Sequence, residues 1–154
     1  MIWLRALLFT VLLPGTIAVY LPWGLVDELP LPPLFWRAVS LPFFAAGLAV
    51  YLWCVWDFVT FGGGTPAPID APRRLVVRGL YRHTRNPMYV GVLTFLLGWV
   101  VRYRSGGMLA YAIVVWLGFQ TFVLLYEEPH LTRVFGDEYT AYRAAVRRWL
   151  PRRG

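Results

Sequence analysis

Four apolar runs, separated by polar or basic segments, constrain this sequence more than any other feature. They cover about residues 3–26, 38–59, 87–101 and 108–126. A helix rises 1.5 Å per residue, so a run of about 20 apolar residues crosses a hydrocarbon core about 30 Å thick. We therefore predict an all-α integral membrane protein with a single domain, a helical bundle of about four transmembrane helices.

The composition supports a lipid environment. Hydrophobic residues make up 58% of the chain and charged residues 15%, whereas soluble domains are about 25% charged. The fifteen basic residues are all arginines, against eight acids, which gives a formal charge of +7. A basic chain can bind nucleic acid, but here the arginines lie in loops and in the tail, so we expect membrane lipids as partners and no nucleic acid.

The positions of the arginines predict the topology. Twelve of them fall in the N-terminal segment, the loop 60–86 and the tail 127–154, while Arg37, Arg102 and Arg104 fall in the other connections. Cytoplasmic segments are enriched in arginine. We therefore expect both termini, this loop and the tail to be cytoplasmic, in an inner (plasma) membrane of bacterial type.

The N-terminal run has one competing interpretation. Arg5 followed by an apolar stretch imitates a cleaved signal peptide, but the run continues past Pro14 without a clear cleavage site, so we expect the first span to be retained. Residues 27–37 then predict a short external loop.

The tail has the pattern of an amphipathic helix on the cytoplasmic side. Gly136 suits a helix end and Asp137 a new N-cap. Apolar and aromatic side chains then recur at helical spacing opposite Arg143 and Arg147: Tyr139, Tyr142, Val146, Trp149 and Leu150. We predict that this helix lies on the membrane surface or covers the cytoplasmic ends of the spans.

The last two spans should bring two distant motifs together. A six-residue turn joins them, so they should be antiparallel neighbours, with Glu127 and Glu128 returning to the end where Arg85 and Asn86 begin. Asn86-Pro87 has the form of a helix start, with the asparagine as cap. Paired carboxylates at a helix C-terminus are unfavourable, so we expect something to compensate them.

Pro129 sharpens this expectation, because it should end or kink the helix beside the two glutamates. The glutamates could instead be solvated, or could pair with arginines of the loop or tail: Arg82, Arg85 or Arg133. The tyrosines in this region, Tyr81, Tyr89 and Tyr139, could be interfacial anchors.

Metal and disulfide chemistry are not expected. His83 and His130 lack a third ligand at a suitable spacing. Cys54 is the one cysteine in the chain, so an intrachain disulfide is impossible and a buried spectator role is favoured.

Two stretches resemble a known family. The first is residues 79–91, GLYRHTRNPMYVG, and the second comprises residues 127–131, EEPHL, and 135–142, FGDEYTAY. Both are similar to the isoprenylcysteine carboxyl methyltransferase and phospholipid N-methyltransferase superfamily of integral membrane methyltransferases. The resemblance covers about residues 73–151. It implies S-adenosylmethionine as cofactor, held at the cytoplasmic ends of the last helices.

The resemblance also implies site residues. It places a cofactor pocket along the basic loop, the start of the third span and the end of the fourth: Arg73, Arg74, Leu75, Val76, Tyr81, Asn86, Pro87, Met88, Tyr89, Glu127 and Glu128. The catalytic candidates are Glu127, Glu128, Tyr89 and Arg85.

The sequence departs from the family pattern at two positions. Asn86 stands where the family usually has histidine, and an amide cannot titrate, which disfavours general-base chemistry there. Val123 stands where the isoprenylcysteine enzymes have an arginine associated with the substrate carboxylate, which disfavours an isoprenylcysteine acceptor.

We therefore expect a methyltransferase whose lipophilic acceptor, a lipid amine, thiol or carboxylate, arrives from the bilayer. The alternative is a noncatalytic membrane scaffold or lipid-binding subunit, in which the glutamates and arginines form a structural ion network. A small transporter is disfavoured, because ion-coupled transport uses ionisable residues inside the membrane spans. Asp57 is the one acidic residue inside the apolar runs, and it lies near the end of its run.

Overall fold

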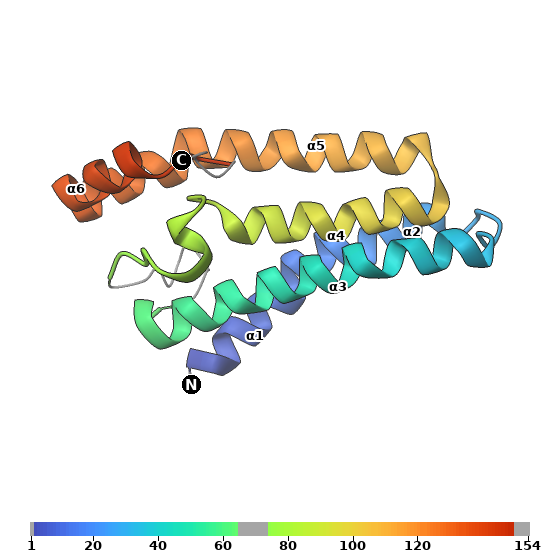
Figure 1. The fold of residues 1–154 in the computed structure, drawn as a ribbon, viewed down its shortest axis with the longest axis horizontal. Helices are drawn as coiled ribbons and strands as arrows, with labels where there is room; N and C mark the ends of the chain where they lie inside the picture. The colour runs from blue at the N-terminus through green and yellow to red at the C-terminus, as the bar shows by residue number, and fades with distance from the viewer. Residues whose placement is uncertain (1, 65–73, 150–154) are drawn as a thin grey trace.

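The chain folds into long helices packed side by side (Figure 1). The computed structural model describes residues 2–64 and 74–149, and no strand occurs in these two ranges. Three continuous helical runs are long and apolar enough to cross a membrane: Ile2–Val26, Leu34–Gly62 and Gly106–Ala145. A fourth apolar helix, Pro87–Tyr103, is shorter. The predicted all-helical membrane architecture is therefore confirmed.

Apolar side chains cover much of the outer surface. Leu12, Leu34 and Leu125 are 69%, 76% and 76% exposed. Exposing such a surface to water is unfavourable, whereas contact with lipid tails is not. This surface is what an integral membrane protein requires.

The first run consists of α1 (Ile2–Leu12), a π-helical turn η1 (Thr16–Tyr20) and α2 (Leu21–Val26). Pro22 has no N–H for the carbonyl of Ala18, and the N–H of Leu21 bonds to Thr16 instead of Ile17. Side chains from later helices replace both bonds: Trp99 Nε1 donates to the Ala18 carbonyl at 2.9 Å, and Tyr111 donates to that of Ile17 at 2.7 Å. The irregular turn thus becomes a packing point for α4 and α5.

The second run starts earlier than the sequence predicted. Helix α3 (Leu34–Asp57) begins directly after Pro33, whose extended conformation and accepted bond from the N–H of Arg37 start the first turn. The connection between the first two runs is therefore shorter than residues 27–37, and Arg37 is helical. A π-helical turn, η2 (Phe58–Gly62), continues α3.

Helices α3 and α4 (Pro87–Tyr103) pack closely because glycines face each other. A Cβ added at Gly47 would lie 2.6 Å from the Gly91 carbonyl oxygen and 2.5 Å from the Phe95 backbone nitrogen. Small residues let helix backbones approach in this way. This close backbone contact sets the position of α4 along α3.

Helices α4 and α5 (Gly106–Phe122) form the predicted antiparallel hairpin. The turn is tighter than expected, because Arg104 takes a left-handed conformation (φ 50°) and Ser105 caps α5 by accepting from the N–H of Met108. Helix α4 has 17 residues, so it is about 26 Å long.

The sequence predicted that the helix ends or kinks at Pro129, and it does not end there. A π-helical turn, η5 (Val123–Glu127), leads without interruption into α6 (Glu128–Ala145), and Glu128 itself is helical. The N–H of Glu128 bonds to the carbonyl of Val123, and this wider turn accommodates the missing N–H of Pro129. The break expected at Gly136 is present as a kink with φ 52°.

The tail helix ends earlier than predicted, so it does not include all the apolar positions expected on its face. Helix α6 stops at Ala145, and Val146 is extended (φ −120°, ψ 131°). Trp149 therefore does not continue the helical face of Tyr139 and Tyr142. Leu150 lies outside the described residues.

Candidate functional site

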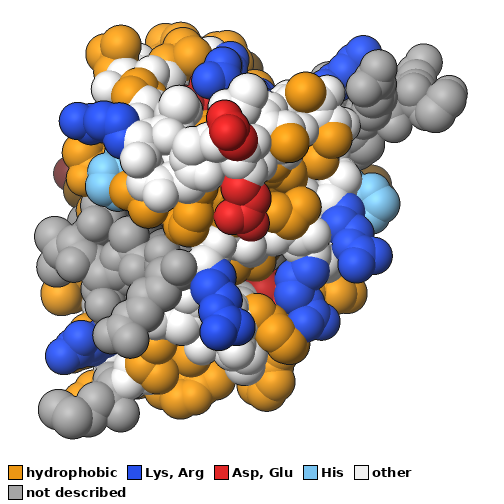
Figure 2. All heavy atoms as spheres, turned by 90° about the vertical axis from the view of Figure 1, so that its left-hand side faces the viewer, with side chains coloured by type: hydrophobic (Ala, Val, Ile, Leu, Met, Phe, Trp, Pro, Cys, Tyr) orange, Lys and Arg blue, Asp and Glu red, His pale blue; other side chains and the backbone are white. Residues whose placement is uncertain are grey.

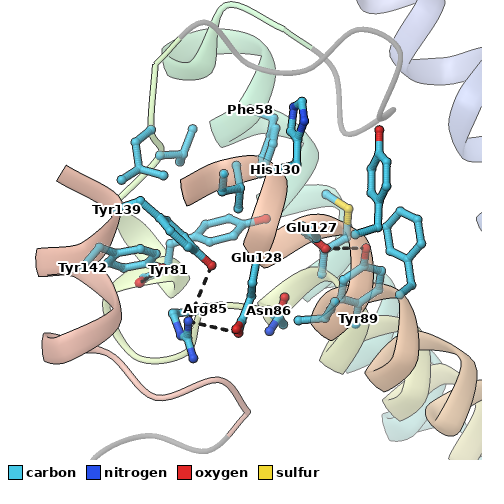
Figure 3. Close-up of a pocket in the computed structure, with 17 residues that line it drawn as sticks. Phe58, Tyr81, Arg85, Asn86, Tyr89, Glu127, Glu128, His130, Tyr139 and Tyr142 are labelled. Atoms are coloured by element: carbon cyan, nitrogen blue, oxygen red, sulfur yellow. Dashed lines mark hydrogen bonds and ion pairs between the residues drawn. The ribbon is translucent and has the colours of Figure 1, made fainter. Parts of the chain in front are cut away.

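The start of α4 and the end of the α5 run meet at one end of the bundle, as the hairpin predicts. Tyr89, in the first turn of α4, donates a hydrogen bond of 2.9 Å to Oε2 of Glu127 (Figure 3). The two residues are 38 positions apart in the chain. The motifs that the sequence placed at one site are therefore in direct contact.

A cleft of about 950 Å³ of empty space, including its open mouth, surrounds this contact, and we call it the site cleft. Its lining is largely aromatic and apolar, and comes from η2, the loop before α4, α4, the end of α5, η5 and α6: Phe58, Leu75, Val76, Tyr81, Arg85, Asn86, Met88, Tyr89, Phe122, Val123, Tyr126, Glu127, Glu128, His130, Leu131, Tyr139 and Tyr142.

Most of the predicted site residues line this cleft. Pro87 is buried behind the lining, Arg74 is exposed and does not contribute to the wall, and Arg73 lies outside the described residues. The sequence prediction missed eight of the lining residues: Phe58, Phe122, Val123, Tyr126, His130, Leu131, Tyr139 and Tyr142. Phe58 follows α3 and carries no motif that could have identified it.

The two adjacent glutamates have different environments. Successive helical residues point about 100° apart. Glu127 faces the cleft, where Tyr89 is its hydrogen-bond partner among the described residues. Glu128, 6% exposed, faces arginines instead.

Glu128 is the centre of an ion network. Arg148 donates two bonds to its carboxylate, at 2.7 and 3.0 Å, and Arg85 Nη1 lies 3.0 Å from Oε1. Arg143 lies further away, at 3.9 Å. Burial alone would raise the pKa of Glu128, but the bonds from Arg148 and the charges of these arginines lower it below its ordinary value. Glu128 is thus an ionised structural group.

Asn86 does not cap α4 with its side chain, contrary to prediction. Pro87 does occupy the first turn, but the Asn86 amide donates to the carbonyl of Arg148 at 3.1 Å. Thr84 donates to the same carbonyl at 2.8 Å, and the N–H of Arg85 donates to the carbonyl of Arg147 at 2.9 Å. The Asn86 side chain therefore bonds to the C-terminal part of the chain instead of capping the helix.

Residues 146–149, the C-terminal segment, therefore cross over the start of α4. Trp149 extends the contact to α5, because its Nε1 donates to Gln120 Oε1 at 2.6 Å. This segment is not helical. The bonds from Thr84, Arg85 and Asn86 go to backbone carbonyls of Arg147 and Arg148, so no side-chain pattern could have predicted them.

The loop before α4 supplies the opposite wall. Tyr81 lies in a 3-10 turn, η4 (Gly79–Arg82), and packs against Phe58 and Cys54. Its carbonyl accepts a 2.7 Å bond from Tyr142. Burial, with the nearby Cys54 and Glu127, raises the pKa of Tyr81 well above its ordinary value. The Tyr81 hydroxyl therefore stays protonated and serves as a neutral wall group.

A second opening lies beside the site cleft, and we call it the apolar groove. It has about 1100 Å³ of empty space between the first helical run, α3, α4 and α5. Met88, Tyr89 and Phe122 line both openings. The site cleft and the apolar groove therefore meet at Tyr89.

Comparisons with known proteins agree on one group. The family described as phospholipid methyltransferase matches residues 35–138, more than half of the chain. Protein-S-isoprenylcysteine O-methyltransferase A of Arabidopsis thaliana is 36% identical over 78 residues, which are 50% of this chain and 39% of that protein. The Schizosaccharomyces pombe protein-S-isoprenylcysteine O-methyltransferase is 33% identical over 78 residues, 50% of this chain and 33% of that protein.

A shorter relative matches along its whole length. An uncharacterized protein of Haemophilus influenzae is 40% identical over 70 residues, which are 41% of this chain and 100% of that protein. This chain spans only 33% to 40% of the length of the named methyltransferases that it matches. No solved structure matches it.

Proposed function

The chain belongs to the phospholipid methyltransferase family, and we propose that it is a membrane methyltransferase that uses S-adenosylmethionine bound in the site cleft. The observation that carries this proposal is the environment of Glu127. Its carboxylate faces an aromatic cleft, and no arginine forms an ion pair with it among the described residues. A carboxylate in such surroundings favours a cationic ligand.

The lining of the cleft fits the proposed cofactor. Tyr81 and Tyr89 offer aromatic faces that can pack on adenine or attract a sulfonium by a cation–π interaction. Glu127 can meet the amine, the ribose hydroxyls or the sulfonium.

The start of α4 is the proposed binding point for the cofactor carboxylate, since free backbone N–H groups at a helix start attract anions. Asn86, Pro87 and Met88 form this start. Proline has no N–H and that of Asn86 donates to Thr84, so the N–H groups of Met88 and Tyr89 are the ones available. Leu75 and Val76 of the preceding loop line the cleft and would pack against the adenosyl part of the cofactor. Roles for Arg73 and Arg74 remain proposals from the family resemblance.

S-adenosylmethionine supplies, when bound, an electrophilic methyl group on a positively charged sulfur. The residues of the chain would hold the acceptor atom in line with this methyl group and exclude water. Glu127 can take up a proton at a carboxylate oxygen if the acceptor releases one. Asn86 cannot do so, because its amide does not titrate.

The apolar groove supports a lipophilic acceptor. It opens among membrane-spanning helices and joins the site cleft at Tyr89. A hydrocarbon chain in the groove would place a lipid amine, thiol or carboxylate at the cleft. The acceptor would then enter from the bilayer, while the cofactor enters from water.

We also propose that the chain crosses the membrane four times, with the site on the cytoplasmic side. The ends of η2 and η5 and the start of α4 lie at the same end of the bundle as the N-terminus (Figure 1). Most arginines belong to this end, which the positive-inside rule assigns to the cytoplasm. The kinked, charged helix α6 would then lie outside the hydrocarbon core.

The noncatalytic scaffold predicts that both glutamates belong to one ion network. Glu128 meets this description, since it binds Arg85 and Arg148. Glu127 does not, because it bonds to Tyr89 in the cleft. This difference favours the methyltransferase.

Calorimetry on the detergent-purified protein tests the proposal. S-adenosylmethionine should bind the wild type. Replacing Glu127→Gln should weaken binding at least tenfold, because it removes a charge-assisted contact worth about 1.5–3 kcal/mol. Tyr89→Phe should weaken it less, and Tyr20→Phe, at an exposed tyrosine outside the cleft, should leave it unchanged. Absence of binding to the wild type would favour the scaffold.

A further inference from the structure

A third cavity borders the ion network of Glu128. It has about 710 Å³ of empty space, and its described lining runs from Arg143 to Arg148 and includes Arg85. Four of these residues are arginines, and none is acidic. We call Arg85, Arg143, Arg147 and Arg148 the arginine cluster. Figure 2 shows this end of the molecule, where several arginine side chains reach the surface.

The cluster holds more positive charge than its carboxylate partner can balance. Arg148 and Arg85 make the close contacts to Glu128, while Arg143 stays 3.9 Å away. Arg147 forms no ion pair within residues 2–64 and 74–149. Three guanidinium groups therefore face a single carboxylate. With Arg147, which lines the same cavity, they leave a local excess of positive charge.

One donor of the cluster is buried without a partner. The Arg85 side chain is 9% exposed, and its Nε, which water does not reach, has no acceptor among the described residues. Its Nη1 is already used by Glu128 and, more weakly, by Tyr139 at 3.5 Å (Figure 3). A buried donor without an acceptor costs about 1–3 kcal/mol. The unpaired Nε shows that this network has fewer acceptors than donors.

We propose that the arginine cluster is a phosphate-binding site, distinct from the site cleft although Arg85 lines both. Guanidinium groups bind phosphate through paired N–H donors. Three excess positive charges suit a phosphate, which can carry two negative charges, better than a carboxylate, which carries one. The phosphate could belong to an anionic lipid headgroup or could be free in solution. The inference does not depend on methyl transfer.

Calorimetry in detergent tests the site with two probes, inorganic phosphate and dihexanoyl phosphatidic acid. The test variant is Arg143→Gln with Arg147→Gln, because both side chains are exposed and neither makes a close bond to Glu128. The matched control is Arg82→Gln with Arg133→Gln, which removes the same charge from exposed arginines outside the cavity. Thermal unfolding of each variant checks that it remains folded.

We expect the wild type and the control to bind, and the test variant to bind at least tenfold more weakly. Binding of both probes would identify free phosphate as sufficient, whereas binding of the lipid alone would identify a headgroup site. Absence of binding to either probe, or equal losses in the test and control variants, would overturn the proposal.

Discussion

Replacing Glu128→Gln should destabilise the protein although it changes the shape of the side chain very little. The amide keeps one acceptor but loses the charge that holds Arg85, whose side chain is 9% exposed, and Arg148, whose side chain is 27% exposed. Breaking a buried ion pair costs about 3–5 kcal/mol. Since Arg148 can regain water, we expect about 2–3 kcal/mol, equivalent to a fall in Tm of roughly 4–12 °C.

Glu127→Gln is the matched control, because it makes the same chemical change at the neighbouring position. The amide can still accept the bond from Tyr89, so the loss of stability should stay below about 1 kcal/mol. Thermal unfolding of both variants in the same detergent measures the difference. Equal stabilities for the two variants, or a larger loss for Glu127→Gln, would refute the assignment of Glu128 as the structural glutamate.

The pH dependence gives the prediction a second readout. The pKa of Glu128 is lower in the folded protein than its ordinary value, so its carboxylate stabilises the fold at neutral pH. This contribution is lost as the pH falls from the ordinary glutamate pKa of about 4.3 through the lower folded value. The wild type should therefore lose its advantage over Glu128→Gln in acid. A constant difference down to this range would contradict the ion-network account.

Two glycine positions give further predictions. Gly79→Ala would place a Cβ 2.5 Å from Asp57 Oδ2, whereas Gly136→Ala shares the positive φ and meets nothing within 4 Å. Gly79→Ala should thus lower Tm and cofactor affinity more than Gly136→Ala, and equal effects would contradict the clash. Gly118→Phe, in the apolar groove, should lower kcat/KM for long-chain acceptors more than for short-chain ones, while Gly24→Phe, also in open space, should not discriminate by chain length.

The helices and their pairing could be predicted because they follow from apolar length and turn length. The span from Pro87 and the return to Glu127 needed only the six-residue turn and the rule that short connections join antiparallel neighbours. Their contact through Tyr89 confirms that inference. The sequence predicted a helix with Tyr139 and Tyr142 on one face, but it did not predict that both line the cleft.

The different environments of Glu127 and Glu128 could not be predicted. Both are glutamates next to Pro129, and nothing in the sequence indicates which of them faces the cleft. Their roles differ because the π-helical turn η5 rotates one toward the cleft and the other toward Arg148, which is 20 residues further along the chain. The C-terminal segment escaped prediction for a related reason, since backbone carbonyls of Arg147 and Arg148 hold it.

The most direct measurement is mass spectrometry of membrane extracts after incubation with S-adenosylmethionine labelled in its methyl group. The account predicts that a lipophilic amine, thiol or carboxylate gains the label with the wild-type protein, and that Glu127→Gln gives far less. Extracts that gain no label with the folded wild type would contradict it.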